Sequence, residues 1–519
     1  MDQKAFLSRL GFSENPFQFT NADEEDHLQA YFIPPPYFHS VWGDPQAPQS
    51  HVIFAPRGGG KSAQRRMIEY KALAENVFAI TYDRFENLGG LSLKNLGIEY
   101  HITNIIRLAT IGFLLEFHSR GLQASAFTKQ EREQVEGLCN GYLGAVSQLE
   151  ALKALDSLKT LSTKAKKLLR EWSGPLSALF STALASSGLP GDVKLGPEAA
   201  TRAKEPGADA RSKAHLEIVR DLLKSVGLTS LYVLIDKVDE TPQTGNNAED
   251  SFHLVKPLLR DLELLQMKGI GFKFFLWDKL EPHHRDFARA DRIQQFTLSW
   301  SATELRTMLS RRLAAFSNGN VEDLGQLTDA QLADPLHSLV VLFANGSPRD
   351  MIRVCQEILS EQLRIDPASE KIGLDAVLEG ITKFSTKRSQ ELLPAHIIRE
   401  LFKVGKVEFT TNHIANNVFK IEVNSARNKI RLWEQMGVVE RIGEIHTGGR
   451  PVFNYAVTDI RVARAMLSQL SLVDFISKKL ANCRNCMAVL TRDWDHSPAG
   501  TCHLCGSETR KIEKPNGGQ

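Results

Sequence analysis

The segment from His51 to Ser62 carries the residue types that bind a polyphosphate. A short apolar run, Val52–Phe54, leads into Ala55, four further residues, and then Gly60-Lys61-Ser62. Glycines let backbone N–H groups curve around phosphates, the lysine reaches the β- and γ-phosphates, and the serine hydroxyl ligates Mg²⁺. The spacing predicts a P-loop with alanine in place of its first glycine. The residues expected to hold the nucleotide here are Ala55, Pro56, Arg57, Gly58, Gly59, Gly60, Lys61 and Ser62.

A second apolar stretch supplies the acid that such a loop requires. The run Leu231–Ile235 ends in Asp236, and an acid at the end of a strand beside a P-loop holds Mg²⁺ together with the loop serine. Ser62 and Asp236 are therefore the predicted Mg²⁺ ligands, ATP is the predicted nucleotide, and Lys61 and Asp236 are predicted to act in catalysis.

The acid that orients the attacking water is less clearly marked. Many ATPases place a glutamate directly after the metal-binding aspartate, but this chain has Lys237 there. Acids recur at Asp239 and Glu240, and we expect Glu240 to serve as the base, with Asp239 in reserve. Asp278 follows another apolar stretch at a place suited to sensing the γ-phosphate, although a plain turn aspartate explains it equally well.

Four of the six cysteines form a set near the C-terminus. Cys483 and Cys486 are followed, after fifteen residues, by Cys502 and Cys505. Two C-x-x-C pairs at this spacing bring four thiolates around one Zn²⁺, and four protein ligands make the site structural. A redox role does not fit, because the motif occurs twice and lacks a thioredoxin-like context. The other two cysteines are isolated, and we expect them to be buried apolar residues.

The order of elements predicts an α/β protein with a P-loop NTPase parallel sheet, since apolar strands alternate with helices. A helical insertion and a helical lid are expected, followed by a winged helix-turn-helix and a zinc ribbon. The predicted parts are residues 1–50 packing on the core, the core 51–300 with an insertion at about 98–187 and a mobile loop at 187–212, the lid 301–384, the winged helix 385–465 and the ribbon 478–512.

The chain resembles AAA+ ATPases of the replication-initiator and STAND-like branches over roughly residues 12–365. The resemblance lies in the P-loop, the strand ending in Asp236, and Gly346-Ser347-Pro348-Arg349 within the helical lid. It implies ATP hydrolysis, a homo-oligomer, and contact of Arg349 with the nucleotide. It also implies an arginine acting in trans. Three arginines follow the apolar stretch that precedes Asp278. We rank Arg292 first as the trans-acting arginine, ahead of Arg285 and Arg289.

Residues 393–459 resemble a winged helix. Three helical stretches precede two alternating strands, and we expect Asn424 to cap the third helix. Ile430 and Trp433 form the apolar side of that helix. Arg427, Asn428 and Arg431 would then face duplex DNA, with Arg450 on the wing. A winged helix used for protein contacts is the alternative, and the zinc ribbon could bind a protein partner.

The composition of the chain limits the classes of protein to which it can belong. The chain has 519 residues, 42% of them apolar and 24% charged, as in ordinary globular proteins. No apolar run is long enough for a membrane helix and no signal peptide is evident, so we expect a cytoplasmic protein without membrane contact.

From residue 401 onward there are 17 Lys and Arg against 11 Asp and Glu, which weakly favours a polyanion partner. A STAND-like ATP switch, with C-terminal modules that bind a protein, and a non-catalytic DNA-binding scaffold remain the alternatives.

Overall fold

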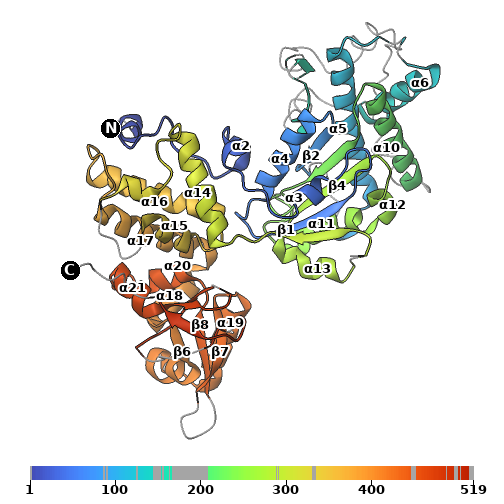
Figure 1. The fold of residues 1–519 in the computed structure, drawn as a ribbon. Helices are drawn as coiled ribbons and strands as arrows, with labels where there is room; N and C mark the ends of the chain where they lie inside the picture. Colours follow the sequence, from blue (N-terminus) through green and yellow to red (C-terminus); the bar gives the residue numbers. More distant parts are fainter. Residues whose placement is uncertain are drawn as a thin grey trace. The chain divides into compact units, whose positions relative to one another are not determined.

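The computed structural model of the chain has two compact units (Figure 1). One unit is Pro34–Ser299, and the other combines Met1–Ile33 with Trp300–Gln519. The residues that the structure describes are 3–85, 88, 92–123, 125, 127–143, 154, 157–162, 164–165, 167, 208–287, 289, 291–329, 335–445, 452–486, 488–495, 501–502 and 504–512. The predicted mobile loop 187–212 lies mostly outside them.

A five-stranded parallel sheet forms the centre of the Pro34–Ser299 unit. Its strand order is β2-β3-β4-β1-β5. The strands are β1 His51–Ala55, β2 Phe78–Tyr82, β3 Leu231–Ile235, β4 Ile270–Trp277 and β5 Gln294–Thr297. Strand β4 lies between β1 and β3 and pairs with both in parallel. The carboxyl ends of these three strands therefore meet at one edge of the sheet, where parallel α/β sheets place their ligands.

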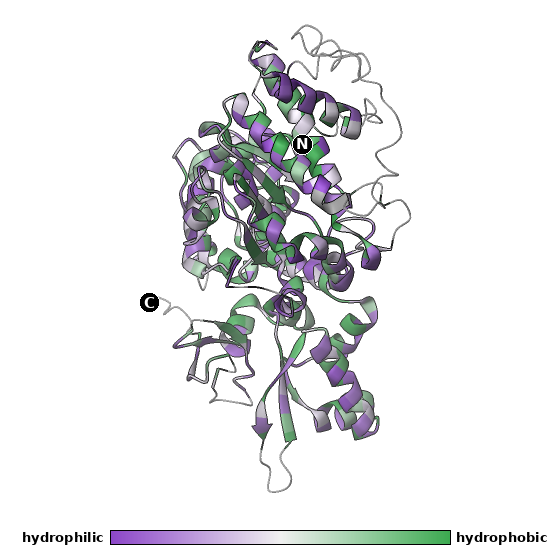
Figure 2. Ribbon diagram, turned by 90° about the vertical axis from the view of Figure 1, so that its right-hand side faces the viewer, coloured by the Kyte–Doolittle hydropathy of each residue, from purple (hydrophilic) through white to green (hydrophobic). Residues whose placement is uncertain are grey.

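Helices cover both faces of this sheet, which explains why its inner strands are buried and mostly apolar (Figure 2). Side chains of one face, such as Phe54 and Val233, belong to a core shared with three helices: α5 Ile98–Ser119, α10 Ala208–Ser225 and α11 Ala248–Arg260. The other face meets α4, Lys61–Ala74. Tyr232 on that face donates a hydrogen bond of 2.8 Å to the carbonyl oxygen of Trp42.

The second face also buries a lysine. Lys273 of β4 has no exposed surface, and its Nζ lies 2.6 Å from the Gln49 carbonyl oxygen and 3.1 Å from His51 Nδ1. Burial lowers the pKa of Lys273 to about 7, because an apolar surrounding disfavours the charged form.

The region predicted as a helical insertion begins with α5 and continues with α6, Lys129–Leu138. Thr160, in the described stretch 157–162 of this region, meets the outer edge of the sheet. Thr160 Oγ1 accepts a hydrogen bond from the Ala79 N–H at 3.0 Å and donates to the Ala79 carbonyl at 2.8 Å. Because β2 is an edge strand, this threonine satisfies backbone groups that would otherwise be unpaired.

The predicted lid corresponds to helices of the second unit, α14 Ala302–Phe316, α15 Leu336–Ala344, α16 Pro348–Ile365 and α17 Leu374–Leu392. Helix α17 packs closely on α16, since a Cβ at Gly380 would lie 2.7 Å from Ile358 Cα. Ser347 caps α16 by accepting a hydrogen bond from the Asp350 N–H.

We expected residues 1–50 to pack on the core, but the structure assigns the first 33 of them to the other unit. They belong to the same unit as the lid. The buried Arg312 of α14 donates to the Phe19 carbonyl, pairs with Glu25 and lies 4.6 Å from the centre of the Tyr31 ring. A buried arginine needs such partners, and the N-terminal segment supplies them. The stretch from Pro34 onward belongs to the unit of the parallel sheet.

The predicted winged helix is present. It comprises α18 Ala395–Val404, β6 Glu408–Thr410, a π-helical turn His413–Phe419, α19 Val423–Gln435, β7 Val439–Ile445 and β8 Val452–Val457. Its sheet is antiparallel in the order β6-β8-β7. Asn424 does not cap α19 as expected. The helix begins at Val423, two residues before the predicted start, with Glu422 at its N-cap position, and the Asn424 side chain instead accepts a hydrogen bond of 3.1 Å from Arg427.

Two short helices, α20 Ile460–Met466 and α21 Leu472–Lys479, lead to a small antiparallel sheet of β9 Leu480–Cys483, β10 Val489–Thr491 and β11 Thr509–Lys511. The sheet, helical lid and C-terminal modules confirm the predicted α/β fold class. Among the described residues, no helix has the length and apolar character needed to cross a bilayer.

Candidate nucleotide site and zinc centre

The three glycines of the P-loop are each required by its backbone. Gly58 and Gly60 have φ angles of 77° and 99°, a region that residues with a Cβ rarely adopt. A Cβ at Gly59 would lie 2.9 Å from the Pro56 carbonyl oxygen. The loop therefore curves tightly from β1 into α4, and a glycine loop leading into a helix N-terminus is a common site for phosphate binding.

Lys61 begins α4 and is nearly buried at the loop. Its Nζ donates to the carbonyl oxygens of Ala55 and Pro56, at 3.2 and 3.4 Å. Burial lowers the pKa of Lys61, and nearby carboxylates oppose this shift. Those carboxylates belong to Asp239, Asp236, Glu240 and Asp278. The structure thus brings all four predicted acids within electrostatic range of the P-loop lysine.

Ser62 and Asp236 meet as the predicted Mg²⁺ site requires. Ser62 Oγ lies 2.9 Å from Asp236 Oδ2, although 174 positions separate the residues. Two hard oxygen donors at the carboxyl end of β3, beside a phosphate-binding loop, fit Mg²⁺, which is bound by one or two carboxylates together with substrate phosphates.

Lys237, which occupies the place where many ATPases keep a glutamate, forms an ion pair with Asp83. Its φ is 56°, a left-handed conformation uncommon for a lysine, and its Nζ lies 3.3 Å from Asp83 Oδ2 at the end of β2. Burial raises the pKa of Asp83, while the positive charges of Lys237 and Arg65 oppose the shift. Sequence patterns gave no indication of Asp83.

Asp239 is already engaged. Arg57, from the P-loop itself, donates from Nε to Asp239 Oδ2 at 2.8 Å, and its guanidinium lies 4.2 Å from the centre of the Trp277 ring. Asp239 is only 2% exposed, whereas Glu240 is exposed. The structure therefore separates the two candidate bases: Asp239 anchors the loop, and Glu240 is the one open to a ligand. The anchoring role of Arg57 was not expected from the sequence.

The remaining predicted nucleotide contacts are placed as follows. Asp278 starts a short 3-10 turn directly after β4. Arg292 is exposed and its Nε lies 3.5 Å from Asp291 Oδ2, and the neighbouring Arg285 and Arg289 also pair with acids. Arg349 is exposed on the first turn of α16, in the other unit. Nucleotide contact by Arg349 and action of Arg292 in trans stay predictions.

The four cysteines of the C-terminal segment converge. Their Sγ atoms all lie within 4.8 Å of one another; Cys483 and Cys505 are 3.4 Å apart, and Cys486 and Cys502 are 3.7 Å apart. A tetrahedral Zn²⁺ with bonds of about 2.3 Å separates its sulfurs by about 3.8 Å. Backbone N–H groups of Asn485 and Cys486 donate to Cys483 Sγ, which favours a thiolate. The donor set therefore fits zinc.

Among the described residues, the apolar cluster around the four cysteines of this ribbon is very small. Besides Cys483 and Cys502, it contains Leu490, with Ala488 packed against it. So few apolar contacts cannot offset the entropy of ordering the segment. Zinc binding would supply that free energy.

The predicted DNA-facing side of α19 is solvent-exposed. Arg427, Asn428 and Arg431 are exposed, while Ile430 and Trp433 are buried at 1% and 0%. Arg450 of the predicted wing lies outside the described residues.

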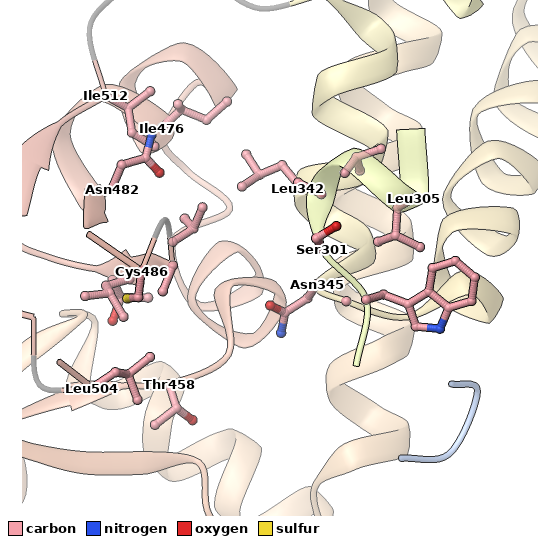
Figure 3. Close-up of a pocket in the computed structure, with 18 of the residues that line it drawn as sticks. Ser301, Leu305, Leu342, Asn345, Thr458, Ile476, Asn482, Cys486, Leu504 and Ile512 are labelled. Carbon is pink, nitrogen blue, oxygen red and sulfur yellow. The ribbon is translucent and has the colours of Figure 1, made fainter. Parts of the chain in front are cut away.

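A pocket of about 820 Å³ lies within the second unit. Figure 3 shows Leu305, Leu342 and Asn345 of the lid on one side, with Cys486 and Leu504 of the ribbon on the other. Glu440 and Thr458 of the winged helix also line it. None of the predicted nucleotide or DNA contacts among the described residues lines this pocket.

No protein-family model matches this chain, and no curated protein matches it in sequence. Solved structures do match it. They include ORC1 of Aeropyrum pernix in complex with DNA (TM-score 0.37, 11% identity, 87% of this chain and 96% of that one). ORC2 of Aeropyrum pernix, in ADPNP–ADP complexes, has a TM-score of 0.37 at 11% identity, over 85% of this chain and 97% of that one. A point mutant of Thermotoga maritima RuvB has a TM-score of 0.23 at 14% identity, over 49% of this chain and 83% of that one.

Proposed function

We propose that this chain is an AAA+-like ATPase that binds and hydrolyses Mg-ATP and couples its nucleotide state to engagement of duplex DNA. The observation that carries the proposal is the 2.9 Å bond between Ser62 Oγ and Asp236 Oδ2 beside a tightly curved glycine loop. A serine hydroxyl and a strand-end carboxylate at this position are the protein ligands of Mg²⁺ in P-loop enzymes.

The chain's own residues then take defined roles. Loop N–H groups bind the phosphates, and Lys61 Nζ exchanges its bonds to Ala55 and Pro56 for phosphate oxygens. Mg²⁺, when bound, neutralises charge on the β- and γ-phosphates. Glu240 orients the attacking water and accepts its proton.

DNA engagement is proposed for the winged helix. Arg427 and Arg431 lie on the exposed side of α19, and cations on such a helix bind phosphates or base edges. The zinc ribbon would serve as a second contact module. A homo-oligomer would allow Arg292 of one copy to reach the nucleotide of the next.

The decisive experiment measures ATP turnover with and without duplex DNA, for the wild-type chain and for Lys61→Ala. We expect stimulation by DNA in the wild type and loss of nucleotide binding in the variant. The variant should remain folded, because among the described residues the Lys61 side chain bonds to the carbonyls of Ala55 and Pro56 and to no distant segment. Equal ATP affinity and turnover in the two proteins would contradict the proposal.

One observation favours a second candidate, a slow ATP switch that oligomerises and binds a protein partner. The position directly after Asp236 carries Lys237, which pairs with Asp83, so the acid that many ATPases keep there is missing. Nucleotide-dependent oligomerisation without DNA, together with turnover that DNA does not change, would favour this switch.

A further inference from the structure

A buried arginine shares the carboxylate that is proposed to hold Mg²⁺. Arg65 lies on α4, three residues after Ser62, and its side chain has no exposed surface. Its Nε donates to Asp236 Oδ2 at 2.9 Å, the same oxygen that accepts from Ser62 Oγ. The other oxygen, Oδ1, accepts the Lys237 N–H at 2.9 Å. Both oxygens of Asp236 are therefore engaged, and one of them by a full positive charge.

The guanidinium of Arg65 is fixed from its other side as well. Arg65 also pairs with Glu69, one helical turn further along α4. Glu69 in turn bonds to Arg66 at 3.0 Å and to the Thr81 hydroxyl. Arg65, Glu69 and Asp236 are all nearly or fully buried. Because a buried charge cannot leave its partners without a large desolvation cost, Arg65 stays beside Asp236 when a nucleotide binds.

A cation at the Ser62–Asp236 site would thus meet a like charge already bonded to its carboxylate. Two like charges a few ångströms apart in a buried environment repel each other more strongly than they would in water. A hydrogen bond donated to a carboxylate oxygen also weakens that oxygen as a metal ligand. Arg65 also offers a permanent positive charge that partly replaces a cation at this position.

We propose that Arg65 is a positioning residue that weakens the Mg²⁺ requirement of this P-loop, so that the site retains nucleotide when Mg²⁺ is scarce. The inference rests on the proposed ATP binding. It concerns how far the affinity for nucleotide depends on Mg²⁺, and it makes no statement about the rate of hydrolysis.

The test titrates a fluorescent, non-hydrolysable ATP analogue into the full-length chain in Mg²⁺ and in EDTA. It then titrates Mg²⁺ at saturating analogue to obtain the half-saturating concentration. For the wild type we expect analogue affinities within about fivefold of each other in the two buffers. For the charge-matched double variant Arg65→Gln/Glu69→Gln we expect affinity in EDTA to fall by at least about tenfold relative to Mg²⁺, and the half-saturating Mg²⁺ concentration to fall by about tenfold.

Arg66→Gln is the matched control. Arg66 bonds to Glu69 at 3.0 Å as Arg65 does, but its described contacts do not include Asp236. We expect its Mg²⁺ titration to follow the wild type. A merely structural role for Arg65 would lower thermal stability in the double variant without moving the Mg²⁺ half-saturation, and that result would overturn the proposal.

The single variant Glu69→Gln should change the half-saturating Mg²⁺ concentration in the opposite direction. It also tests the proposal if the double variant does not fold. When its bond to Glu69 is lost, Arg65 keeps its bond to Asp236, so the half-saturating Mg²⁺ concentration should rise. An unchanged or lower value would contradict the proposal. Absence of analogue binding to the wild type in both buffers would instead refute ATP binding itself, whereas an absolute Mg²⁺ requirement in the wild type would refute only the role of Arg65.

Discussion

Arg57 Nε donates to Asp239 Oδ2 at 2.8 Å, so a P-loop residue holds the acid that stands three positions after Asp236. This pair engages Asp239 inside the site, so we keep Glu240 as the first candidate for the catalytic base and Asp239 in reserve. It also ties the phosphate-binding loop to the turn after β3. The loop and the end of that strand therefore move together.

Glu240→Gln should slow ATP turnover by about 100-fold or more while nucleotide affinity stays unchanged, because an amide cannot accept the proton of water. The measurement is kcat and analogue affinity, determined separately. Asp239→Asn is the comparison. It weakens the partner of Arg57, so we expect it to reduce nucleotide affinity. Turnover at the wild-type rate in Glu240→Gln would remove Glu240 from the mechanism.

The double variant Arg427→Ala/Arg431→Ala should weaken binding of duplex DNA and flatten its salt dependence. Each lost phosphate contact lowers the magnitude of the slope of log affinity against log salt by about 0.9. The measurement is fluorescence anisotropy across a salt series. Arg364→Ala/Lys371→Ala removes the same charge from the lid, where both side chains pair with acids, and should leave the slope unchanged. An unchanged slope in the α19 variant would favour protein contact by the winged helix.

Much of the site could be predicted because its motifs are local. The P-loop spans one turn between β1 and α4, so the strand, the glycine loop and the helix follow from spacing alone. The two C-x-x-C pairs behave in the same way, since each places two sulfurs by local turn geometry. Asp236 could be found because an apolar strand ending in an acid has a distinctive pattern.

Pairings between distant segments could not be predicted. Arg57 with Asp239, Lys237 with Asp83, and Arg65 with Asp236 join residues from different strands and helices, and only the strand order β2-β3-β4-β1-β5 brings them together. The surface on which the N-terminal segment packs could not be predicted for the same reason. Its aromatic and proline residues indicated packing, but the surface they meet is fixed by a buried cation, Arg312, nearly 300 residues away.

Stability of the chain should depend on pH through Lys273. Its pKa is lowered by burial to about 7 in the folded chain, and it returns to about 10.4 on unfolding. Between these values the unfolded chain binds the proton and the folded chain does not. The free energy of unfolding therefore rises with pH across this window, by up to about 1.4 kcal/mol per unit.

Urea unfolding of the Pro34–Ser299 transition at pH 7, 8, 9 and 10 measures this slope. Lys273→Met removes the titrating group, so its free energy of unfolding should rise less steeply with pH than that of the wild type. Lys279→Met, at an exposed position, should keep the wild-type slope. Parallel slopes in Lys273→Met and the wild type would show that the lysine does not titrate in this range.

Zinc should bind at one ion per chain and order the C-terminal ribbon. Cys486→Ser removes one of four sulfurs that lie within 4.8 Å of one another, and the apolar core around Leu490 is too small to hold the segment without metal. We expect zinc content to fall and amide exchange to accelerate from about residue 480 to 512, as measured by atomic emission and hydrogen exchange. Nucleotide affinity should persist, because the P-loop lies in the other unit with its own core.

Cys355→Ala, which alters an isolated buried cysteine of α16, should keep full zinc content. A zinc-free wild type, or a Cys486→Ser chain with full zinc and unaltered protection, would show that these cysteines are not a metal site.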